Sequence, residues 1–551
     1  MSASTEFVWW RDGVVYQIYP RSFMDSDGDG VGDLEGLISR LDYLAGAPDS
    51  LGVDALWLSP IAPSPGYDFG YDISDYDGID PLFGSAESFD RLVEEAHKRG
   101  LRVILDLVMN HTSHLHPWFV EARSSRSNPK RDWYLWRDAT RPGRAPNFWQ
   151  AVFGGSAWQW DPVTSQYYYH MFLPQQPDLN WRNPAVVKAM TELMKRWMDR
   201  GVDGFRLDVV NAYFKDEQLR DNPFKLGFRP YDMQRHQYDL DRPELAEVYQ
   251  TLRATTDQYP DRMMVGEVMI PDPQKAARYC GTGRDQLHQT FNFAYLQLPW
   301  KASAFQQAIL EWEGALHPDA WPAQVLNNHD IDRFVTRAGV DRWSDARARV
   351  AGCLLLTLRG TPYLYYGEEL GLLNTSIPRA ELVDPPGRRY WPFYKGRDPA
   401  RTPMPWSPQP GGGFTSGQPW LRLNRDLAER NVETQLRDPA SVLCTYRALL
   451  RVRKGSRALQ RGSFQVLQRE PKQVLSYLRV HDGQAVLVAL NFSTCPARVK
   501  LDAELPTRVW EPLFSTHPLS PGRLVGNELE LAPLEAALWE GQVESGALVV
   551  T

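Results

Sequence analysis

The sequence predicts an α/β fold: a (β/α)8 TIM barrel with an inserted subdomain after its third strand, a lid insertion after its eighth strand and a C-terminal antiparallel β-sandwich. Two observations support this prediction. Short apolar runs with strand character alternate with stretches of helical periodicity over most of the chain, which is typical of parallel βα units. Charged side chains follow several of these runs, as at Asp208, Glu267 and Asp330. Because a barrel collects the C-terminal ends of its strands at one mouth, we expect these side chains to share one site.

The strands and helices can be placed in order along the chain. The eight predicted strands are 14–20, 53–60, 102–110, 202–210, 262–269, 288–293, 324–330 and 361–366. The predicted helices are 33–46, 86–100, 185–201, 242–259, 304–316, 344–358 and 441–459. The alternative is an open doubly wound sheet, but no glycine-rich phosphate loop follows the first strand. A closed barrel is therefore favoured.

Two gaps are too long for the loops of a minimal barrel. Segment 111–179 follows the third strand and is rich in tryptophan and tyrosine, so we expect a small subdomain, domain B. Segment 367–439 follows the eighth strand, is rich in proline, glycine and arginine, and is expected to form a lid. The barrel, domain A, then comprises 1–110 and 180–460. Both insertions overhang the mouth, which favours a small substrate or a chain end over the middle of a polymer.

The pattern changes in 461–551, where short strand-like runs are separated by turn residues. This segment predicts an antiparallel β-sandwich, domain C. It contains no candidate catalytic cluster, so we expect a structural role; carbohydrate binding is the alternative.

Composition excludes several classes of partner. The formal net charge is −7 and there is no basic run, which argues against nucleic acid. No apolar run approaches transmembrane length and residues 1–11 lack the pattern of a signal peptide, so we expect no membrane partner and a cytoplasmic location. The four cysteines are far apart, show no metal spacing and are expected to be free thiols. The oligomeric state does not follow from the sequence.

The end of the fourth predicted strand holds the first candidate for a catalytic group. Arg206 and Asp208 lie two residues apart, so on a strand they face the same side. A nearby guanidinium favours an ionised carboxylate, and we expect it to lower the pKa of Asp208, as a carboxylate nucleophile requires. The alternative is a structural ion pair at a strand end.

The loop after the first strand has the spacing of a cation site. Its carboxylates are two residues apart and Gly30 occupies the sixth position, as in a Ca²⁺ loop. The twelfth position is Gly36, where an EF-hand has glutamate, so we expect a single structural Ca²⁺ (or Mg²⁺) site and no calcium sensor. A metal-free acidic loop is the alternative. The expected ligands are Asp25, Asp27, Asp29, the backbone carbonyl of Val31, and Asp33.

Four strand-end motifs together resemble a known family. They are DLVMNH at 106–111, GFRLD at 204–208, GEV at 266–268 and NHD at 328–330. In this order they resemble the α-amylase-type glycoside hydrolases of family 13, over nearly the whole chain. QIYPRSF at 17–23, QPDLN at 176–180, GRD at 396–398 and RTPMPW at 401–406 are most similar to the exo-acting α-glucosidase and oligo-1,6-glucosidase branch.

The resemblance implies a retaining exo-α-glucosidase that removes terminal nonreducing glucose from short α-glucosides of the maltose or isomaltose type. Asp208 would attack the anomeric carbon, and Glu267 would protonate the leaving oxygen and then activate water. Asp330 would contact sugar hydroxyls that bind more tightly in the transition state.

The resemblance also implies a set of substrate-binding residues. Asp68 and Arg397 would pair across the nonreducing end, with Arg401 sharing the role of Arg397, and Tyr71 would stack on the sugar. The resemblance implies that His111 and His329 bind sugar hydroxyls, and for either histidine alone the alternative is a structural role. The full implied set is Asp68, Tyr71, His111, Phe153, Phe172, Gln176, Arg206, His329 and Arg397.

The sequence does not decide between α-1,4 and α-1,6 bonds, or between hydrolysis and transfer of glucose. Val209 favours tolerance of α-1,6 bonds, whereas segment 234–240 and the compact lid are more similar to enzymes that prefer α-1,4 bonds. Sucrose isomerases, trehalose synthases and transglucosidases carry the same three carboxylates and are the nearest alternatives. A non-catalytic, transport-associated relative is disfavoured, because this chain retains all three carboxylates and shows no anchor.

Overall fold

The computed structural model describes residues 6–269 and 272–543. Eight parallel strands close into a barrel in the order β1-β11-β10-β9-β8-β7-β3-β2, which confirms the predicted fold class. Each lies within or one residue outside its predicted run. The barrel strands are β1 (Val15–Ile18), β2 (Ala55–Leu58), β3 (Arg102–Leu107), β7 (Gly204–Leu207), β8 (Met263–Gly266), β9 (Gln289–Asn292), β10 (Ala323–Val325) and β11 (Thr361–Tyr365).

The barrel strands are buried on both faces, which explains their continuous apolar sequence. Trp57, Ile104, Val265, Phe291 and Tyr363 belong to one buried cluster that fills the interior of the barrel. The interior is therefore a packed core, and the chemistry lies at the C-terminal ends of the strands.

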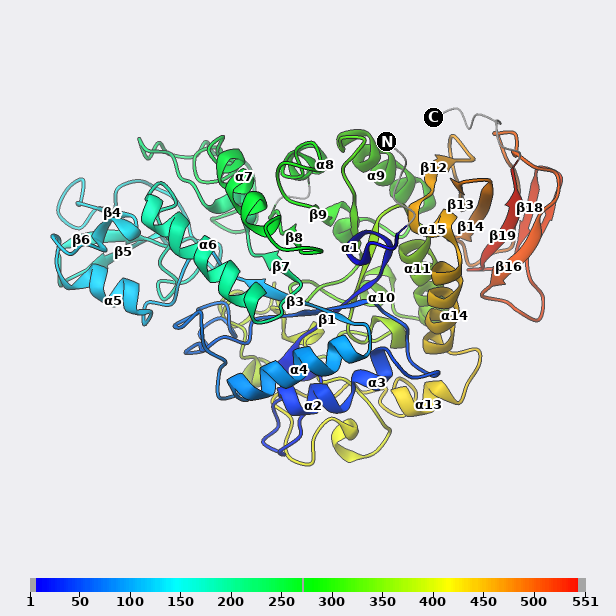
Figure 1. Cartoon of the computed structure of the whole chain (residues 1–551), viewed down its shortest axis with the longest axis horizontal. Coiled ribbons are helices and arrows are strands. Elements are labelled where there is room, and N and C mark those ends of the chain that lie inside the picture. The colour runs from blue at the N-terminus through cyan, green and yellow to red at the C-terminus, as the bar shows by residue number, and fades with distance from the viewer. Residues whose placement is uncertain (1–5, 270–271, 544–551) are drawn as a thin grey trace.

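Helices surround the barrel (Figure 1). In α4, Ser85 caps the first turn through a capping box with Ser88, and residues at helical spacing, among them Phe89, Leu92 and Val93, are buried. The helices of the barrel region are α1 (Trp9–Asp12), α2 (Leu34–Ser39), α3 (Leu41–Leu44), α4 (Ala86–Lys98), α6 (Pro184–Asp199), α7 (Leu245–Thr256), α8 (Pro273–Arg278), α9 (Ala302–Ala315), α10 (Phe334–Ala338), α11 (Ser344–Thr357), α14 (Val442–Gly455) and α15 (Arg457–Arg461).

Two predicted helices are each divided in the structure. Segment 33–46 forms α2 and α3, which meet at Arg40. Segment 441–459 forms α14 and α15, because Ser456 has extended backbone angles and its side chain accepts a hydrogen bond from the backbone N–H of Leu459. A serine that caps a new helix ends the preceding one.

The inserted subdomain contains α5 (Pro117–Ser124) and a three-stranded antiparallel sheet of β4 (Trp136–Arg137), β6 (Gln166–Tyr169) and β5 (Trp158–Asp161). It lies at one end of the long axis in Figure 1, and the C-terminal domain lies at the other. A second buried cluster, which includes Phe153, Phe172 and Tyr169, joins it to Val209 and Tyr231 from the segment after β7. The subdomain is thereby packed directly beside the strand end that carries Asp208.

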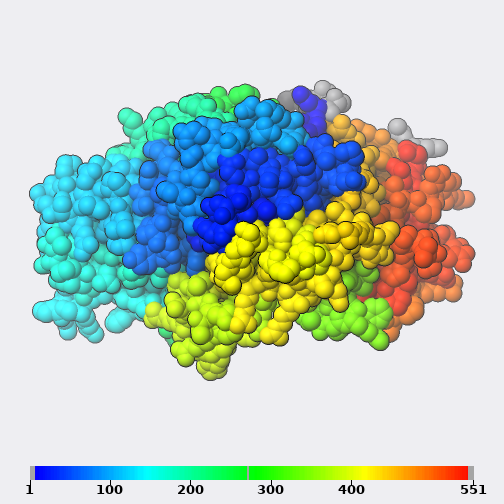
Figure 2. Space-filling view, turned by 90° about the horizontal axis from the view of Figure 1, so that it is seen from below, coloured from blue at the N-terminus to red at the C-terminus, as the bar shows by residue number. Residues whose placement is uncertain are grey.

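The lid contains short helices, of which α12 (Pro385–Tyr390) and α13 (Val432–Leu436) are α-helical. Much of it packs beside the N-terminal part of the barrel, as the yellow and blue surfaces of Figure 2 show. Backbone hydrogen bonds join the two, from Asp25 N to Phe414 O at 3.0 Å and from Met404 N to Ser22 O at 2.8 Å.

Domain C has one sheet in the order β12-β13-β14-β19-β16 and a second in the order β15-β18-β17. Leu487 and Trp539 of the first sheet and Leu529 of the second share one buried cluster, so the two sheets form the predicted antiparallel sandwich. The strands are β12 (Ser463–Val466), β13 (Val474–His481), β14 (Gln484–Asn491), β15 (Ala497–Lys500), β16 (Glu511–Ser515), β17 (Arg523–Val525), β18 (Glu528–Leu531) and β19 (Ala536–Gln542).

Candidate active site

A buried arginine holds the acidic side chains of the strand ends together. Asp208 and Glu267 directly follow β7 and β8, while Asp106 on β3 is the register partner of Arg206 on β7. Nη1 of Arg206 donates to Asp106 Oδ1 at 2.7 Å and to Asp208 Oδ1 at 2.6 Å, and Nη2 donates to the carboxylate of Glu267. The barrel register therefore places three carboxylates round one guanidinium.

The protonation of this cluster follows from its burial. Burial raises the pKa of Glu267 to about 8 and that of Asp208 to about 7, against the opposing field of Arg206. The expected lowering of the pKa of Asp208 was wrong, because burial and the neighbouring Asp106 outweigh the field of Arg206. Glu267 nevertheless keeps its proton to a higher pH than Asp208, which suits an acid beside a nucleophile.

Asp330 has the opposite shift. Burial favours its neutral form, but His329, whose Nε2 lies 3.2 Å from Asp330 Oδ2, and the guanidinium groups of Arg397 and Arg401 outweigh burial and hold the pKa of Asp330 well below its usual range. Arg401 Nη2 lies 2.9 Å and Arg397 Nη1 3.3 Å from Asp330 Oδ1. Asp330 is thus a permanent anion beside the other two carboxyl groups.

One end of the site is closed by a network centred on Arg397. Its Nη2 donates to Asp68 Oδ1 at 2.7 Å, and Gln176 Nε2 donates to Asp68 Oδ2 at 3.1 Å. Asp384, which is fully buried, accepts from Arg397 Nη2 at 2.6 Å and from Nε at 2.9 Å. The Asp68–Arg397 pair that the family resemblance implied is therefore present, and the lid residue Asp384 holds it in place.

His329 and Tyr71 are stacked, with ring centroids 5.4 Å apart and planes 3° from parallel. Gln17 Nε2 donates to His329 Nδ1 at 2.8 Å, so the ring proton is on Nε2, which lies 2.5 Å from the hydroxyl of Tyr71. That hydroxyl donates to Asp106 Oδ2 at 3.0 Å. Burial lowers the pKa of His329 well below its usual value, so the ring is neutral and acts as a fixed donor.

His111 is held in a similar way. Its Nε2 donates to the backbone carbonyl of Tyr71 at 3.0 Å, and Asn110 Nδ2 lies 3.2 Å from its Nδ1. Asn110 is bound in turn by Asp178 and Lys215, whose carboxylate and ammonium groups lie 2.5 Å apart in the interior. Burial lowers the pKa of His111, which keeps the ring neutral.

These residues surround a cavity of about 290 Å³ at the barrel mouth. Arg206, Gln176 and His329 lie behind its wall, in contact with residues that line it. The inserted subdomain and the lid both contribute to the wall. The predicted residues that line the cavity are Asp68, Tyr71, His111, Phe153, Phe172, Asp208, Glu267, Asp330 and Arg397.

Several residues of the site were not among the sequence predictions of functional residues. Asp106 had a signal, since it is an acid in a strand-end motif. Asp384 had none, because it lies in an irregular segment whose position only the folded chain defines. The apolar residues Met269, Phe293 and Ile331 on the open side of the cavity were likewise not predicted.

Val209, directly after Asp208, has φ 39° and ψ 51°. A β-branched residue rarely adopts this left-handed conformation, so the backbone is strained beside the candidate nucleophile. Hydrogen bonds from Asp208 N to Leu107 O and from Val210 N to Glu267 O hold the backbone on both sides of it.

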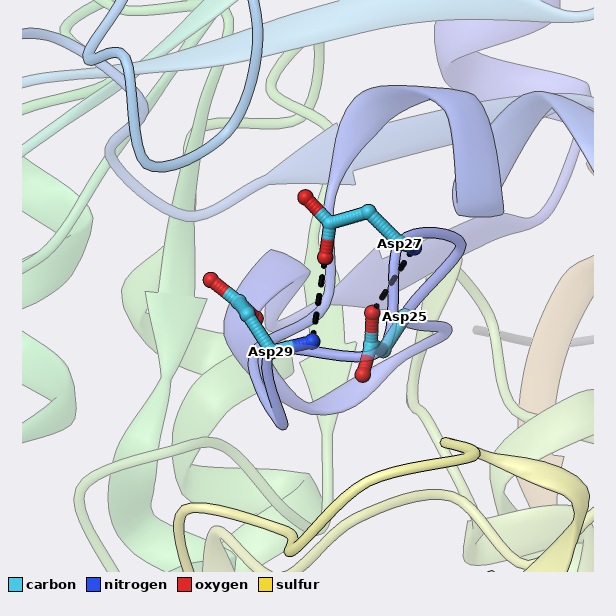
Figure 3. Close-up of side chains that lie close together, drawn as sticks. All are labelled: Asp25, Asp27 and Asp29. Atoms are coloured by element: carbon cyan, nitrogen blue, oxygen red, sulfur yellow. Dashed lines mark hydrogen bonds between the residues drawn. The ribbon is translucent and has the colours of Figure 1, made fainter.

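The acidic loop between β1 and α2 brings three of the predicted metal ligands together. Oxygens of Asp25, Asp27 and Asp29 lie within 4.8 Å of one another (Figure 3). Asp33 is engaged elsewhere, since its carboxylate accepts from Ser26 N, Ser26 Oγ and Gly36 N and caps α2. Clustered carboxylate oxygens fit a hard cation such as Ca²⁺.

The fold and this carboxylate-lined pocket define an α/β-barrel enzyme of the glycoside hydrolase class. The chain matches the family "Alpha amylase, catalytic domain" over residues 17–462 and "Maltogenic Amylase, C-terminal domain" over 464–538. It therefore belongs to the α-amylase family, family 13 of the glycoside hydrolases.

Individual relatives cover nearly the whole chain. A probable alpha-glucosidase of Rhizobium meliloti is 44% identical over 92% of each chain, and an oligo-1,6-glucosidase of Parageobacillus thermoglucosidasius is 38% identical over 97% of this chain and 99% of that one. The alpha-glucosyl transfer enzyme XgtA, whose crystal structure is known, is 44% identical in sequence to this chain. The two structures superpose with a TM-score of 0.91 over 98% of this chain and 100% of that one. The trehalulose synthase MutB from Pseudomonas mesoacidophila is also similar, with 33% identity and a TM-score of 0.86 over 97% and 99% of the two chains.

Within residues 6–269 and 272–543, no helix is both long and apolar enough to cross a membrane.

Proposed function

We propose that the protein is a retaining exo-α-glucosidase that releases terminal nonreducing glucose from short α-glucosides. The closed end of the pocket carries this proposal, because Asp68, Arg397 and Asp384 block the path of a longer chain on one side of Asp208 and Glu267. We infer that one terminal sugar lies between that network and the carboxyl pair, which share one cavity. The names of the glucosidase relatives support the same substrate class.

The chemistry assigned to the carboxyl pair has two steps. In the first, ionised Asp208 attacks the anomeric carbon while Glu267 gives its proton to the leaving oxygen. In the second, Glu267 takes a proton from water, which attacks the same carbon and releases Asp208. Two displacements retain the anomeric configuration. The protonation order of the pair, with the pKa of Glu267 about 8 and that of Asp208 about 7, supports these roles.

The surrounding residues stabilise charge and orient the sugar. Asp330 remains ionised and accepts hydrogen bonds from hydroxyls as positive charge develops on the ring. His111 and His329 are both neutral. His111 and Tyr71 line the cavity and face the sugar, while His329 lies behind the wall and holds the ring of Tyr71 by stacking on it. Asp68 and Arg397 bind the terminal hydroxyls.

Transfer of glucose to another sugar or alcohol is the second candidate. The similarity to an alpha-glucosyl transfer enzyme at 44% identity favours it. It uses the same glucosyl-enzyme and differs only in the acceptor of the second step. The linkage of the natural substrate, α-1,4 or α-1,6, is part of the same question.

We also propose a single structural Ca²⁺ (or Mg²⁺) in the acidic loop, held by Asp25, Asp27, Asp29 and the carbonyl of Val31, with Asp33 ordering the loop. The ion would hold the loop against the lid, since Asp25 also accepts a hydrogen bond from Thr415. It takes no part in the reaction.

The test is product analysis by NMR of the native enzyme and an Asp208→Asn variant on maltose, isomaltose, sucrose, trehalose and starch. Release of α-glucose from disaccharides, abolished in the variant, is the expected result and assigns the linkage. Rearranged disaccharides as main products would identify a transferring enzyme. Unchanged activity in the variant would exclude Asp208 as the nucleophile.

A further inference from the structure

A hairpin in the segment between β7 and α7 carries large apolar side chains on the surface of the molecule. Phe224, Leu226 and Phe228 are 70%, 90% and 69% exposed. They alternate along the chain, so in extended backbone they lie on the same side of it. Exposed apolar residues are normally scattered singly, and a contiguous group of them marks a contact surface.

Two phenylalanines from other segments extend this surface. Phe393 of the lid is 80% exposed, and its ring centroid lies 6.1 Å from that of Phe228. Phe148 of the inserted subdomain is 65% exposed, and its carbonyl accepts a hydrogen bond from Gln234, which pairs with Phe224 across the hairpin. The surface is therefore built from three segments that lie far apart in the sequence. We call it the apolar face; its members are Phe148, Phe224, Leu226, Phe228 and Phe393.

The hairpin is anchored to the molecule, so the exposure of the apolar face does not come from a loose loop. Lys225 N donates to Met233 O at 2.9 Å across the two arms. A Cβ added at Gly227 would lie 2.4 Å from the carbonyl of Asp232, which shows how closely the arms approach each other. Tyr231, near the tip, belongs to the buried cluster of the inserted subdomain.

The outer edge of the hairpin is open. Within the described part of the chain, the backbone N–H groups of Phe224 and Leu226 have no hydrogen-bond acceptor, whereas that of Lys225 between them points to the other arm. An extended edge of this kind is a template for pairing with another chain. Two copies of the same edge can pair in antiparallel fashion about a two-fold axis, which is the commonest symmetry of protein dimers.

The size of the apolar face also fits a dimer. With a surface of about 200 Å² for each ring, the exposed fractions of its five members correspond to about 700 Å². The largest apolar patch of a typical monomer is about 300–600 Å², whereas a stable interface buries about 800 Å² on each partner. The face therefore supplies most of one side of such an interface.

The charges at the rim favour a second copy over a membrane surface. Lys225, Arg235 and Asp221 flank the apolar face and are all exposed, so the rim carries both signs of charge. A mixed rim can be complementary to its own copy. A membrane-binding face needs clustered cations, and the net charge of −7 opposes contact with anionic lipids.

We propose that the apolar face is the interface of a homodimer, in which two copies of the hairpin pair edge to edge about a two-fold axis. This inference does not depend on the proposed function, because none of the five residues belongs to the carboxylate site. The interface lies beside the pocket mouth, since Arg229 and Tyr394, which follow Phe228 and Phe393, line the cavity.

Sedimentation velocity of the full chain over a range of concentrations tests the proposal. The native protein is expected to sediment with twice the chain mass of 63.1 kDa. Leu226→Asp should raise the Kd of the dimer at least about tenfold, because each copy would bury a carboxylate without a partner. Leu519→Asp, at a fully exposed position in domain C, is the matched control and should keep the native Kd.

A second variant guards against local damage to the hairpin. Phe393→Ser changes the apolar face from the lid, leaves the hairpin sequence intact and should also raise the Kd at least about tenfold. Scanning calorimetry of each variant checks that it is folded. Both positions are exposed, so we expect native-like unfolding.

Hydrogen exchange tests the edge pairing separately. The amides of Phe224 and Leu226 should exchange more slowly at concentrations where the native protein is dimeric than at concentrations where it is monomeric. In Phe393→Ser, compared at a concentration where only the native protein is dimeric, both amides should exchange at the monomer rate. Equal exchange in the native dimer and the monomer would overturn the edge-to-edge arrangement.

Three results would overturn the interface. The first is a native protein that remains a monomer at about 100 μM. The second is a dimer whose Kd is unchanged in both Leu226→Asp and Phe393→Ser, or an assembly that grows beyond the dimer. The third is a monomer that floats with phosphatidylglycerol vesicles only while the apolar face is intact, which would make the face a membrane contact.

Discussion

At the scale of single residues, the order in which the buried carboxyl groups bind protons sets the working pH range. Asp208 must be ionised to attack, so activity is lost as pH falls through its pKa of about 7. Glu267 must be protonated to act as acid, so activity is lost as pH rises through its pKa of about 8. We predict a bell-shaped dependence of kcat/KM on pH with a narrow maximum between these values.

Glu267→Gln tests the assignment of the alkaline limb. The amide cannot give a proton, so kcat/KM for maltose should fall by about 10³-fold, while a donor with a good leaving group loses much less. With such a donor, the decline at high pH should disappear and the decline at low pH should remain. An alkaline limb that persists in this variant would show that another group titrates there.

A second prediction at this scale concerns Asp384. Replacing it with asparagine removes a charged partner from Arg397, and the loss of a charge-assisted hydrogen bond should raise KM for maltose by about tenfold with a smaller effect on kcat. Glu381→Gln is the matched control, because it breaks an exposed lid ion pair with Arg422 and should leave KM unchanged. Equal effects of the two variants would contradict the positioning role of Asp384.

At the scale of elements, the contact between the inserted subdomain and α12 closes the pocket. A side chain at Gly154 would meet Tyr390 Oη at 2.1 Å and Arg389 Nε at 2.7 Å. Gly154→Ala should therefore displace the side chains of Tyr390 and Arg389 from their contact with the subdomain, loosen the wall beside Phe153 and raise KM several-fold. Steady-state kinetics on maltose measures this effect.

Gly143→Ala is the control for that variant. Gly143 also has a positive φ, of 75°, but nothing lies within 4 Å of its added Cβ. It should cost about 1 kcal/mol of stability through backbone strain and leave KM unchanged. A similar rise of KM in both variants would mean that strain in the subdomain, and not the contact with the lid, is responsible.

The elements also show what the sequence can predict. The barrel strands were predictable because strands buried on both faces are continuous apolar runs. The division of the last barrel helix at Ser456 was not, since a serine is compatible with a helix interior or with a cap, and tertiary contacts decide between them. In the same way Arg206 and Asp208 were paired correctly, but the pKa of Asp208 depends first on its burial and then on groups such as Asp106, which reaches Arg206 from another strand.

At the scale of the whole molecule, the site is assembled from parts that lie far apart in the sequence. Arg397 of the lid meets Asp68 of the loop after β2, and Gln176 of the inserted subdomain meets the same carboxylate. Asp384 could not be predicted for this reason, since its partner is defined only when the lid has packed on the barrel. The strand-end residues were predictable because the barrel fixes their position by topology alone.

The acidic loop contributes to the stability of the whole molecule, because Asp25 joins the first βα loop to the lid through Phe414 and Thr415. If the loop holds Ca²⁺, the ion binds the native state only, and at 100 times its Kd it should stabilise that state by about 2.7 kcal/mol. For a chain of this size we expect chelation to lower Tm by about 2 °C.

The variant Asp27→Asn/Asp29→Asn should abolish this dependence, since both carboxylates are exposed and their loss removes ligands without disturbing the core. Glu504→Gln, an exposed acid in domain C, is the control and should keep it. Scanning calorimetry of all three proteins with Ca²⁺ and with a chelator measures the shifts. A Tm of the native protein that is the same in both conditions would mean that the three aspartates order the loop through their hydrogen bonds to its backbone N–H groups, with no ion.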